Sequence, residues 1–210
     1  MRSLAAEHLD AVVDVLAQAF AAYPVMRFVL GDAGSRESKE LRTLLRFFAI
    51  ARLLRNEPVL GLESEGSLTA VALVAFPGLV SSPPQLAEHR EQLWHELGPD
   101  ARARYEAFSA ATTQFEIDLP HANLNMIGVR PALHGTGLGR QLMAEVHRIS
   151  AQHPQSSGVT LTTESPHNVP FYQRQGYNLL GRTRVTQELE SWAFFRPDPH
   201  RPDGQKVQLT

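Results

Sequence analysis

The segment of residues 128–140 most constrains what this chain can fold into. It reads GVRPALHGTGLGR, so three glycines alternate at positions 135, 137 and 139. Residues 119–130 are predicted to form a strand that leads into it, whereas apolar residues at helical spacing predict a helix over 137–151. Residues 158–163 are predicted to form a second strand. The chain is therefore predicted to be α/β, with a glycine turn between a strand and a helix.

The glycine turn suits a phosphate group for a physical reason. Glycines let backbone N–H groups approach a ligand without a Cβ atom in the way, and a helix N-terminus adds free N–H groups and a positive dipole end. The spacing is not the G-x-G-x-x-G of dinucleotide-binding folds, and no P-loop lysine follows, because the only lysines are Lys39 and Lys206. The segment therefore predicts either a pyrophosphate site of another kind or a tight structural connection.

The rest of the chain predicts the helices and strands of one domain. A length of 210 residues fits a single domain. Helices are expected at 5–22, at 35–55 with Ser35 or Ser38 as its cap, and at about 86–97, 100–113 and 168–175; strands are expected at 59–63, 68–76, 177–186 and 191–196. The run at 68–76 is nearly all apolar, which is typical of a strand buried on both faces. We expect one domain over 1–196, with a helical insertion at 77–120, and a polar tail at 197–210.

Composition argues against several functional classes. Lys and Arg number 20 against 22 Asp and Glu, so no broad positive field is available to hold nucleic acid. The chain has no cysteine, which removes disulfides, thiolate metal sites and cysteine nucleophiles. No apolar stretch reaches the roughly 20 residues of a membrane span, and no signal peptide is visible. We expect a cytoplasmic protein that binds neither nucleic acid nor a membrane.

A second segment changes the interpretation of the first. Residues 161–177 read LTTESPHNVPFYQRQGY, which predicts a strand, a turn and a short helix carrying Asn168 and Tyr172 one turn apart. Together the two segments resemble the paired motifs of the GNAT acetyltransferase superfamily, V-x-P-x-x-(Q/R)-G-x-G-(I/L)-(G/A)-x-x-L and N-x-x-F-Y-x-x-x-G-(F/Y). Within that superfamily, the form L-x-T-x-x-P-x-N-x-P-F-Y is similar to puromycin N-acetyltransferase and its relatives. The resemblance spans most of residues 5–196 and is densest over 121–181.

The resemblance implies a fold and an acyl donor. The fold is a mixed, strongly twisted sheet flanked by helices, in which the strands ending at Val129 and Thr163 splay apart. The donor is acetyl-CoA, with its pantetheine arm along the first of these strands and its phosphates on the glycine turn. The donor-binding residues that the resemblance implies are Ile127, Gly128, Val129, His134, Gly135, Thr136, Gly137, Leu138, Gly139, Arg140, Asn168, Phe171 and Arg174.

Position 134 departs from the family pattern, because His134 stands where Gln or Arg is usual. A histidine side chain is shorter, and it is charged only part of the time near its reference pKa of about 6.5. Backbone binding of the phosphates should survive this change. Arg140 and Arg174 are spaced to help neutralise phosphates, although a surface arginine is often only solvated.

The resemblance also implies the chemistry, which is direct attack of a primary amine of a small molecule on the thioester in a ternary complex. Tyr172 matches the family's general acid, and its phenol keeps its proton at neutral pH; a buried core tyrosine is the alternative. A backbone N–H near 126–127 could stabilise the oxyanion. The general base has no motif: Glu164, just past a strand end, is the first candidate, followed by Glu116, His121 or a water chain.

The remaining clusters suggest no second site. His89 and His95 lack the spacing of a helical metal pair, so we expect no metal. The aromatic residues of the insertion, Trp94, Tyr105 and Phe108, belong either to the core or to an acceptor pocket. A catalytically inactive acyl-CoA-binding regulatory module is the alternative to an enzyme. The edge of the final strands predicts a homodimer.

Overall fold

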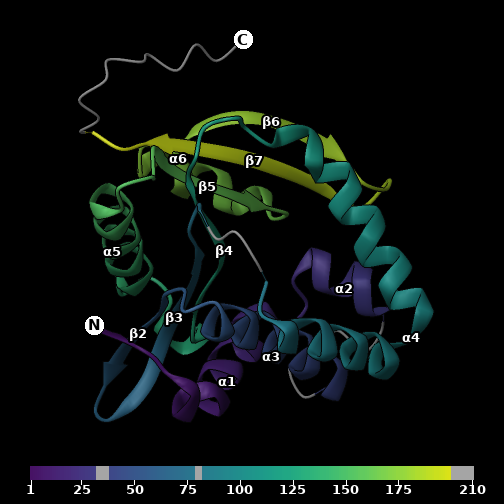
Figure 1. Cartoon of the computed structure of the whole chain (residues 1–210). Helices are drawn as coiled ribbons and strands as arrows, with labels where there is room; N and C mark the ends of the chain where they lie inside the picture. Colours follow the sequence, from purple (N-terminus) through teal and green to yellow (C-terminus); the bar gives the residue numbers. More distant parts are fainter. Residues whose placement is uncertain (32–37, 79–81, 200–210) are drawn as a thin grey trace.

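A computed structural model describes residues 1–31, 38–78 and 82–199, and a seven-stranded mixed sheet lies at its centre (Figure 1). Neighbouring strands are antiparallel except β4 and β5, which are parallel. The predicted class, a mixed sheet flanked by helices, is confirmed. Across the sheet the strands follow the order β1 (Arg2–Ser3), β2 (Val59–Ser64), β3 (Ser67–Ala75), β4 (Ala122–Val129), β5 (Gly158–Thr163), β7 (Glu190–Pro197) and β6 (Asn178–Arg184).

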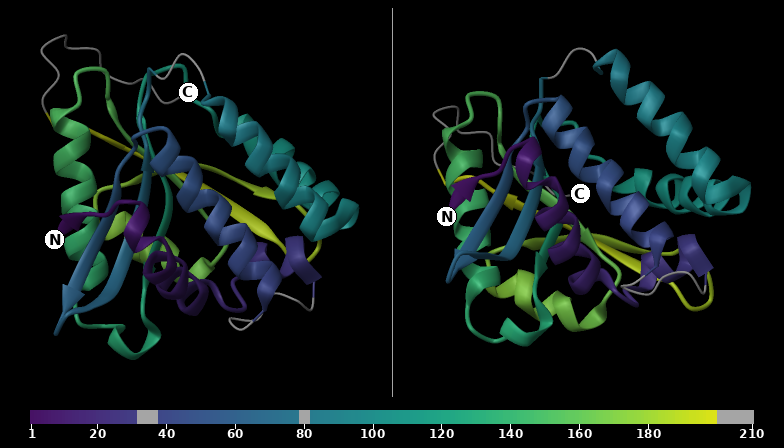
Figure 2. Two further views of the ribbon diagram at one scale, coloured as in Figure 1. Left: turned by 60° about the horizontal axis from the view of Figure 1, so that its bottom comes forward. Right: turned by 90° about the horizontal axis from the view of Figure 1, so that it is seen from below.

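Helices cover both faces of the sheet. Helices α1 (Leu9–Phe20) and α3 (Lys39–Leu54) lie on one face, and α5 (Leu138–Gln152) lies on the other (Figure 2). The side chains of β3 alternate accordingly, because Val71 and Leu73 pack in the cluster with α1 and α3, whereas Ala70, Ala72 and Val74 pack in the cluster with α5. The prediction of a strand buried on both faces is confirmed.

The two parallel strands pair over a short stretch and then separate. Ala122 lies opposite Val159 and Asn123 opposite Thr160, and the ladder ends there. Beyond Asn123, the edge of β4 that faces β5 pairs with no strand in the described part of the chain. This is the splay that the family resemblance implied.

A β-bulge lies at the same level on the other side of β4. Leu73 pairs with Met126 and Val74 with Leu124, so Asn125 is an extra residue of β4 with no counterpart in β3. An extra residue bends a strand and increases its twist. The bulge and the splay together leave a gap in the middle of the sheet.

The first helical region differs from its prediction. The helix expected over 5–22 is a short 3-10 turn (Ala6–His8) followed by α1, and a separate helix α2 (Pro24–Leu30) begins soon after α1 ends. The prediction took Tyr23-Pro24 as an end signal and missed α2. Pro24 is the first residue of α2, where a proline's fixed φ and missing N–H are favourable.

Ser38 is the cap of α3. Its Oγ accepts a hydrogen bond from the backbone N–H of Leu41 at 3.0 Å. The rival cap, Ser35, lies outside the described residues.

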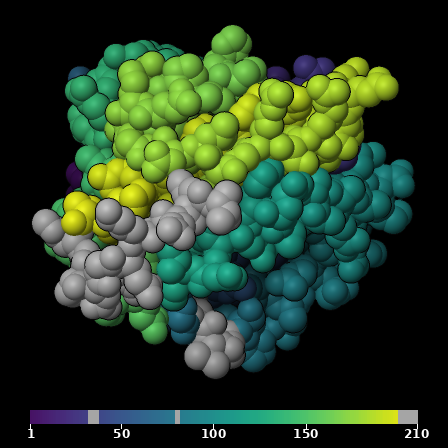
Figure 3. Space-filling view, turned by 90° about the horizontal axis from the view of Figure 1, so that it is seen from above, coloured from purple at the N-terminus to yellow at the C-terminus, as the bar shows by residue number. Residues whose placement is uncertain are grey.

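The segment expected as an insertion, 77–120, is largely helical in its described residues, whereas residues 79–81 lie outside the described ranges and its being an insertion stays a prediction. Helix α4 (Pro84–Thr112) breaks at Gly98, whose φ is 82°, so the two predicted helices are joined at a kink. The second half runs beside β6, as the teal and yellow-green surfaces in Figure 3 show. Just after α4, Gln114 donates a hydrogen bond to Thr183 Oγ1 on β6 at 3.0 Å.

Strand β6 forms an edge of the sheet, and the homodimer expected there stays a prediction. The tail expected at 197–210 begins at the last residue of β7, and its residues 200–210 lie outside the described part. Within the described ranges, no single helix is long and apolar enough to cross a membrane; the segments 6–20 and 24–30, bent by 102°, satisfy length and composition only as a pair.

Candidate functional site

The glycine turn connects the end of β4 to the start of α5. A 3-10 turn (Pro131–Leu133) leaves the strand, and Gly137 is the N-cap residue of α5. Gly135 and Gly137 have φ values of 81° and 89°, which are costly for residues with a Cβ atom. No side-chain hydrogen bond from the described residues caps α5. The free N–H groups of its first turn are therefore available to a ligand.

A groove of about 970 Å³ opens along this turn, and we call it the glycine-loop groove. Its other walls come from α1, the end of β4 and α6 (Val169–Arg174). The structure brings together here every residue that the resemblance implied for donor binding, from Ile127, Gly128 and Val129 through the turn to Asn168, Phe171 and Arg174. Their roles stay predictions.

Basic side chains stand at the glycine-loop groove. Two exposed arginines line the groove: Arg140 lies at the start of α5 and Arg174 at the end of α6. His134 is also exposed, and its Nε2 lies 3.1 Å from the carbonyl oxygen of Val129. With the free N–H groups of α5, these side chains make an electropositive end that suits a phosphate.

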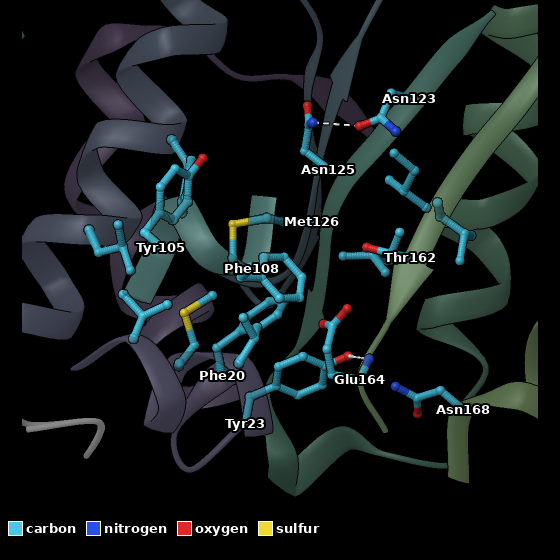
Figure 4. Close-up of a pocket in the computed structure, with 18 of the residues that line it drawn as sticks. Phe20, Tyr23, Tyr105, Phe108, Asn123, Asn125, Met126, Thr162, Glu164 and Asn168 are labelled. Carbon is cyan, nitrogen blue, oxygen red and sulfur yellow. Dashed lines mark hydrogen bonds between the residues drawn. The ribbon is translucent and has the colours of Figure 1, made fainter. Parts of the chain in front are cut away.

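A smaller cavity of about 250 Å³ occupies the gap between β4 and β5, and we call it the inner cavity (Figure 4). Its lining is mostly apolar and comes from helices α1 to α4, from both strands and, at one end, from α6 and the residue before it. The inner cavity and the glycine-loop groove share lining residues, so the two meet at Phe20, Tyr23, Ile127, Asn168 and Tyr172.

Glu164 follows β5 and is buried in the wall of the inner cavity. Its Oε1 accepts a hydrogen bond from Ser191 Oγ at 2.8 Å. Burial raises the pKa of the Glu164 carboxyl from 4.5 to about 7, and hydrogen bonds from Ser191, Thr162 and Tyr23 only partly oppose this rise. A carboxyl with a pKa near neutrality can accept a proton at physiological pH.

Tyr23 holds the turn that carries Glu164. The backbone N–H of Glu164 donates to the Tyr23 hydroxyl at 3.1 Å, and that hydroxyl lies 2.8 Å from Thr163 Oγ1. Burial raises the pKa of Tyr23 well above its usual value, so its phenol stays neutral. The sequence prediction missed this residue because it lies 141 positions from Glu164 and carries no motif of its own.

Tyr172 lies on α6 where the two cavities meet. It is buried, and burial raises its pKa well above the usual value, with the nearby Tyr23 and Glu164 adding to the rise. A phenol in this state can donate a proton and does not act as a base near neutral pH. Asn168 lies one turn earlier, as its spacing predicted, and its Nδ2 donates to Thr163 Oγ1 at 3.2 Å.

A polar end of the inner cavity was also missed by sequence reasoning. Arg52 on α3 is buried, forms an ion pair of 3.0 Å with Glu57, and donates from Nη1 to Asn125 Oδ1 at 2.9 Å. Asn125 Nδ2 in turn donates to Asn123 Oδ1 at 2.5 Å. Arg52 and Asn125 lie 73 positions apart in the sequence, so no local pattern pairs them.

The other candidate bases do not reach either cavity. Glu116 is exposed after a 3-10 turn (Thr113–Phe115). His121 precedes β4, and its Nδ1 lies 2.5 Å from the carbonyl oxygen of Leu119. Neither lines the inner cavity or the glycine-loop groove. Glu164 is therefore the candidate base that the structure brings to the site.

The aromatic residues of the insertion divide between two positions. Tyr105 and Phe108 line the inner cavity, whereas Trp94 does not and packs behind Tyr105 with ring centroids 5.2 Å apart. Within the described part of the chain, no group of three or more His, Asp or Glu side chains is placed to hold a metal ion. The absence of a metal stays a prediction.

Comparisons with known proteins agree with this geometry. Residues 105–191, which include β4, α5, β5 and α6, match the family model described as acetyltransferase (GNAT) domain. A structure described as histone acetyltransferase HPA2 and related acetyltransferase, from Corynebacterium glutamicum, has a TM-score of 0.68 and 21% identity over 96% of this chain and 97% of that one.

Two further solved structures are similar over nearly their whole length. Drosophila melanogaster polyamine N-acetyltransferase has a TM-score of 0.64 and 18% identity over 92% of this chain and 96% of that one. An agmatine N-acetyltransferase has a TM-score of 0.65 and 18% identity over 93% and 97%. At such identities these structures establish the fold. The match of residues 105–191 to the GNAT acetyltransferase model supports a transferase enzyme.

Proposed function

We propose that this GNAT-type enzyme transfers the acetyl group of acetyl-CoA to a primary amine of a small molecule, by direct attack in a ternary complex. The observation that carries the proposal is the meeting of two cavities at Tyr172 and Asn168. One is a long groove with an electropositive end, and the other is a small apolar chamber with a buried carboxyl. A donor in the first and an acceptor in the second would bring their reacting atoms to the shared wall.

The glycine-loop groove fits the donor by its chemistry. Backbone N–H groups of the glycine turn and the side chains of His134, Arg140 and Arg174 would bind the pyrophosphate. On the side that faces β5, the edge of β4 from Ile127 to Val129 pairs with no described strand. This edge can hydrogen-bond an amide-rich arm as an added strand would. Acetyl-CoA combines these two features.

The residues at the shared wall suit the two proton transfers of the reaction. Glu164 would accept a proton from the attacking ammonium, so that the amine nitrogen forms the new C–N bond. A backbone N–H near 126–127 would stabilise the oxyanion. Tyr172 would give its proton to the departing thiolate as the C–S bond breaks, and its phenolate would then take the second proton that the new amide nitrogen loses. At pH values above about 7 the carboxyl is ionised and the phenol is still neutral, which is the state that this mechanism needs.

A small molecule is favoured as the acceptor because the inner cavity has a volume of only about 250 Å³. The structural neighbours named for agmatine and polyamines act on small amines. The motif resemblance to puromycin N-acetyltransferase also favours an antibiotic-like or metabolite amine. A chain without cysteine that uses a CoA thioester suits the reducing cytoplasm.

The test compares two conservative tyrosine variants in an assay of CoA thiol release with a panel of amines. Tyr172→Phe should lower kcat by about 100-fold without changing acetyl-CoA affinity, because a positioned proton donor contributes at this level. Tyr177→Phe is the matched control, since Tyr177 is also buried, lines neither cavity, and its hydroxyl lies 3.1 Å from His147 Nε2. It should keep the wild-type kcat.

Three results would count against this assignment. Wild-type turnover in Tyr172→Phe would remove Tyr172 as the acid. Binding of acetyl-CoA with no transfer to any amine would favour the inactive regulatory module. No acetyl-CoA binding at all would remove the transferase mechanism.

A further inference from the structure

We propose that the acceptor is an aromatic primary amine that carries a single positive charge, and that the inner cavity discriminates against polyamines. This inference rests on the proposed function and goes further by naming the class of the second substrate. It follows from the walls of the inner cavity, from its charges and from the groups at its two ends.

The walls of the inner cavity present aromatic rings from separate elements. Phe20 and Tyr23 come from α1 and the segment after it, Phe48 from α3, and Tyr105 and Phe108 from α4. Phe20 and Tyr23 meet edge to face, with centroids 5.1 Å apart. A substrate ring among them would gain both apolar burial and edge-to-face contacts. The methylene chain of a polyamine would gain only the burial.

Among the described residues, one carboxyl group lines the inner cavity, that of Glu164. It lies near Tyr23 and Asn168, which also line the glycine-loop groove, so the amine of the acceptor belongs at this end (Figure 4). One carboxyl can neutralise one ammonium. A second or third ammonium of a polyamine would need another buried anion, and the lining residues that the structure describes supply none.

The opposite end of the inner cavity is unfavourable to a cation. Asn123 and Asn125 lie there, away from Glu164 (Figure 4). Behind them Arg52 donates to Asn125, which engages its amide oxygen; neither Arg52 nor its ion-pair partner Glu57 lines the cavity. A second ammonium would therefore meet neutral amides instead of a carboxylate. This end suits an uncharged hydrogen-bonding group, such as a phenol hydroxyl.

The experiment measures kcat/KM for acetyl transfer to 2-phenylethylamine, tyramine, agmatine and spermidine. We expect each aromatic amine to exceed each polyamine by about 100-fold or more, because a buried charge without a partner costs several kcal/mol. Tyramine should be at least as good as 2-phenylethylamine, since its hydroxyl can reach the asparagine end.

A matched pair of variants checks that the inner cavity makes this choice. Phe48→Leu removes a lining ring and should lower kcat/KM for 2-phenylethylamine by about tenfold, with little effect on the weak agmatine reaction. Phe47→Leu makes the same change at the adjacent residue, which does not line the cavity, and should leave the ratio of the two substrates unchanged.

The outcomes separate this inference from the proposed function. Preference for agmatine or spermidine over the aromatic amines would overturn the inference and leave the transferase function intact. Equal effects of Phe48→Leu and Phe47→Leu on the substrate ratio would also overturn it. Acetylation of none of the four amines would overturn it too, and acetyl-CoA binding measured in the same samples would then decide whether the proposed function falls with it.

Discussion

Replacing Glu164 by Gln tests how burial sets the charge at the site. The folded protein holds the Glu164 proton up to a pH of about 7, whereas the unfolded chain releases it near 4.5. Below pH 4.5 both states are protonated, so the raised pKa then costs nothing. Between pH 4.5 and 7 only the unfolded state loses the proton, and wild type loses stability relative to the variant. Each pH unit of this window corresponds to about 1.4 kcal/mol, so the full loss is about 3 kcal/mol.

Urea unfolding of wild type and Glu164→Gln at pH 5 and pH 8 measures this loss. The stability difference between the two proteins should shift by about 2.5 kcal/mol in favour of the variant from pH 5 to pH 8, since part of the loss already falls below pH 5. Other titrating groups are common to both proteins and cancel. An equal difference at the two pH values would refute the argument that burial keeps this carboxyl protonated.

Three other predictions follow from the same contacts. The pH profile of kcat/KM should rise with an apparent pKa near 7 in wild type, and Glu164→Gln should lose this limb; a profile unchanged in the variant would exclude Glu164 as the base. His134→Arg should tighten acetyl-CoA binding about fivefold at low ionic strength, because a guanidinium is always charged, and the gain in affinity should shrink as salt is added. Calorimetric titration measures this affinity, and equal affinities of wild type and variant at low ionic strength would contradict the prediction. Gly128→Ala should destabilise the fold by about 1–3 kcal/mol in urea unfolding, because overpacking is costly and the new Cβ atom would lie 2.8 Å from Ala19 Cβ on α1. An unchanged midpoint would contradict the close packing of α1 on β4.

Much of the fold could be predicted because local patterns are strong. The apolar run of β3, the glycine turn and the helix α5 each follow from periodicity or from turn chemistry. The helix α2 was missed because Pro24 is ambiguous: a proline both stops one helix and starts another. The bulge at Asn125 has no local signature, since it depends on the register between β3 and β4.

The candidate site also has one part that the sequence predicts and one part that it does not. The donor-binding residues lie in two continuous segments, so motifs alone group them and the structure brings them to one groove. The acceptor side is built from residues distant in sequence, such as Tyr23 against Glu164 and Arg52 against Asn125, and only the folded chain joins them. Trp94 shows where prediction from the sequence stops. Composition and helix position do not tell which of several neighbouring aromatic residues faces a cavity.

The central claim is that the glycine-loop groove holds the acyl donor, and calorimetric titration of acetyl-CoA tests it most directly. Gly139→Trp would fill this groove, since a Cβ atom at Gly139 lies 3.8 Å from Phe171 and Val129, at a φ that side chains tolerate. Ala144→Trp places the same side chain at an exposed position of α5 outside the groove. We predict micromolar binding to wild type and to Ala144→Trp, and at least a 100-fold loss, on the order of 3 kcal/mol, in Gly139→Trp. Undiminished binding to Gly139→Trp, or no binding to wild type, would contradict the account.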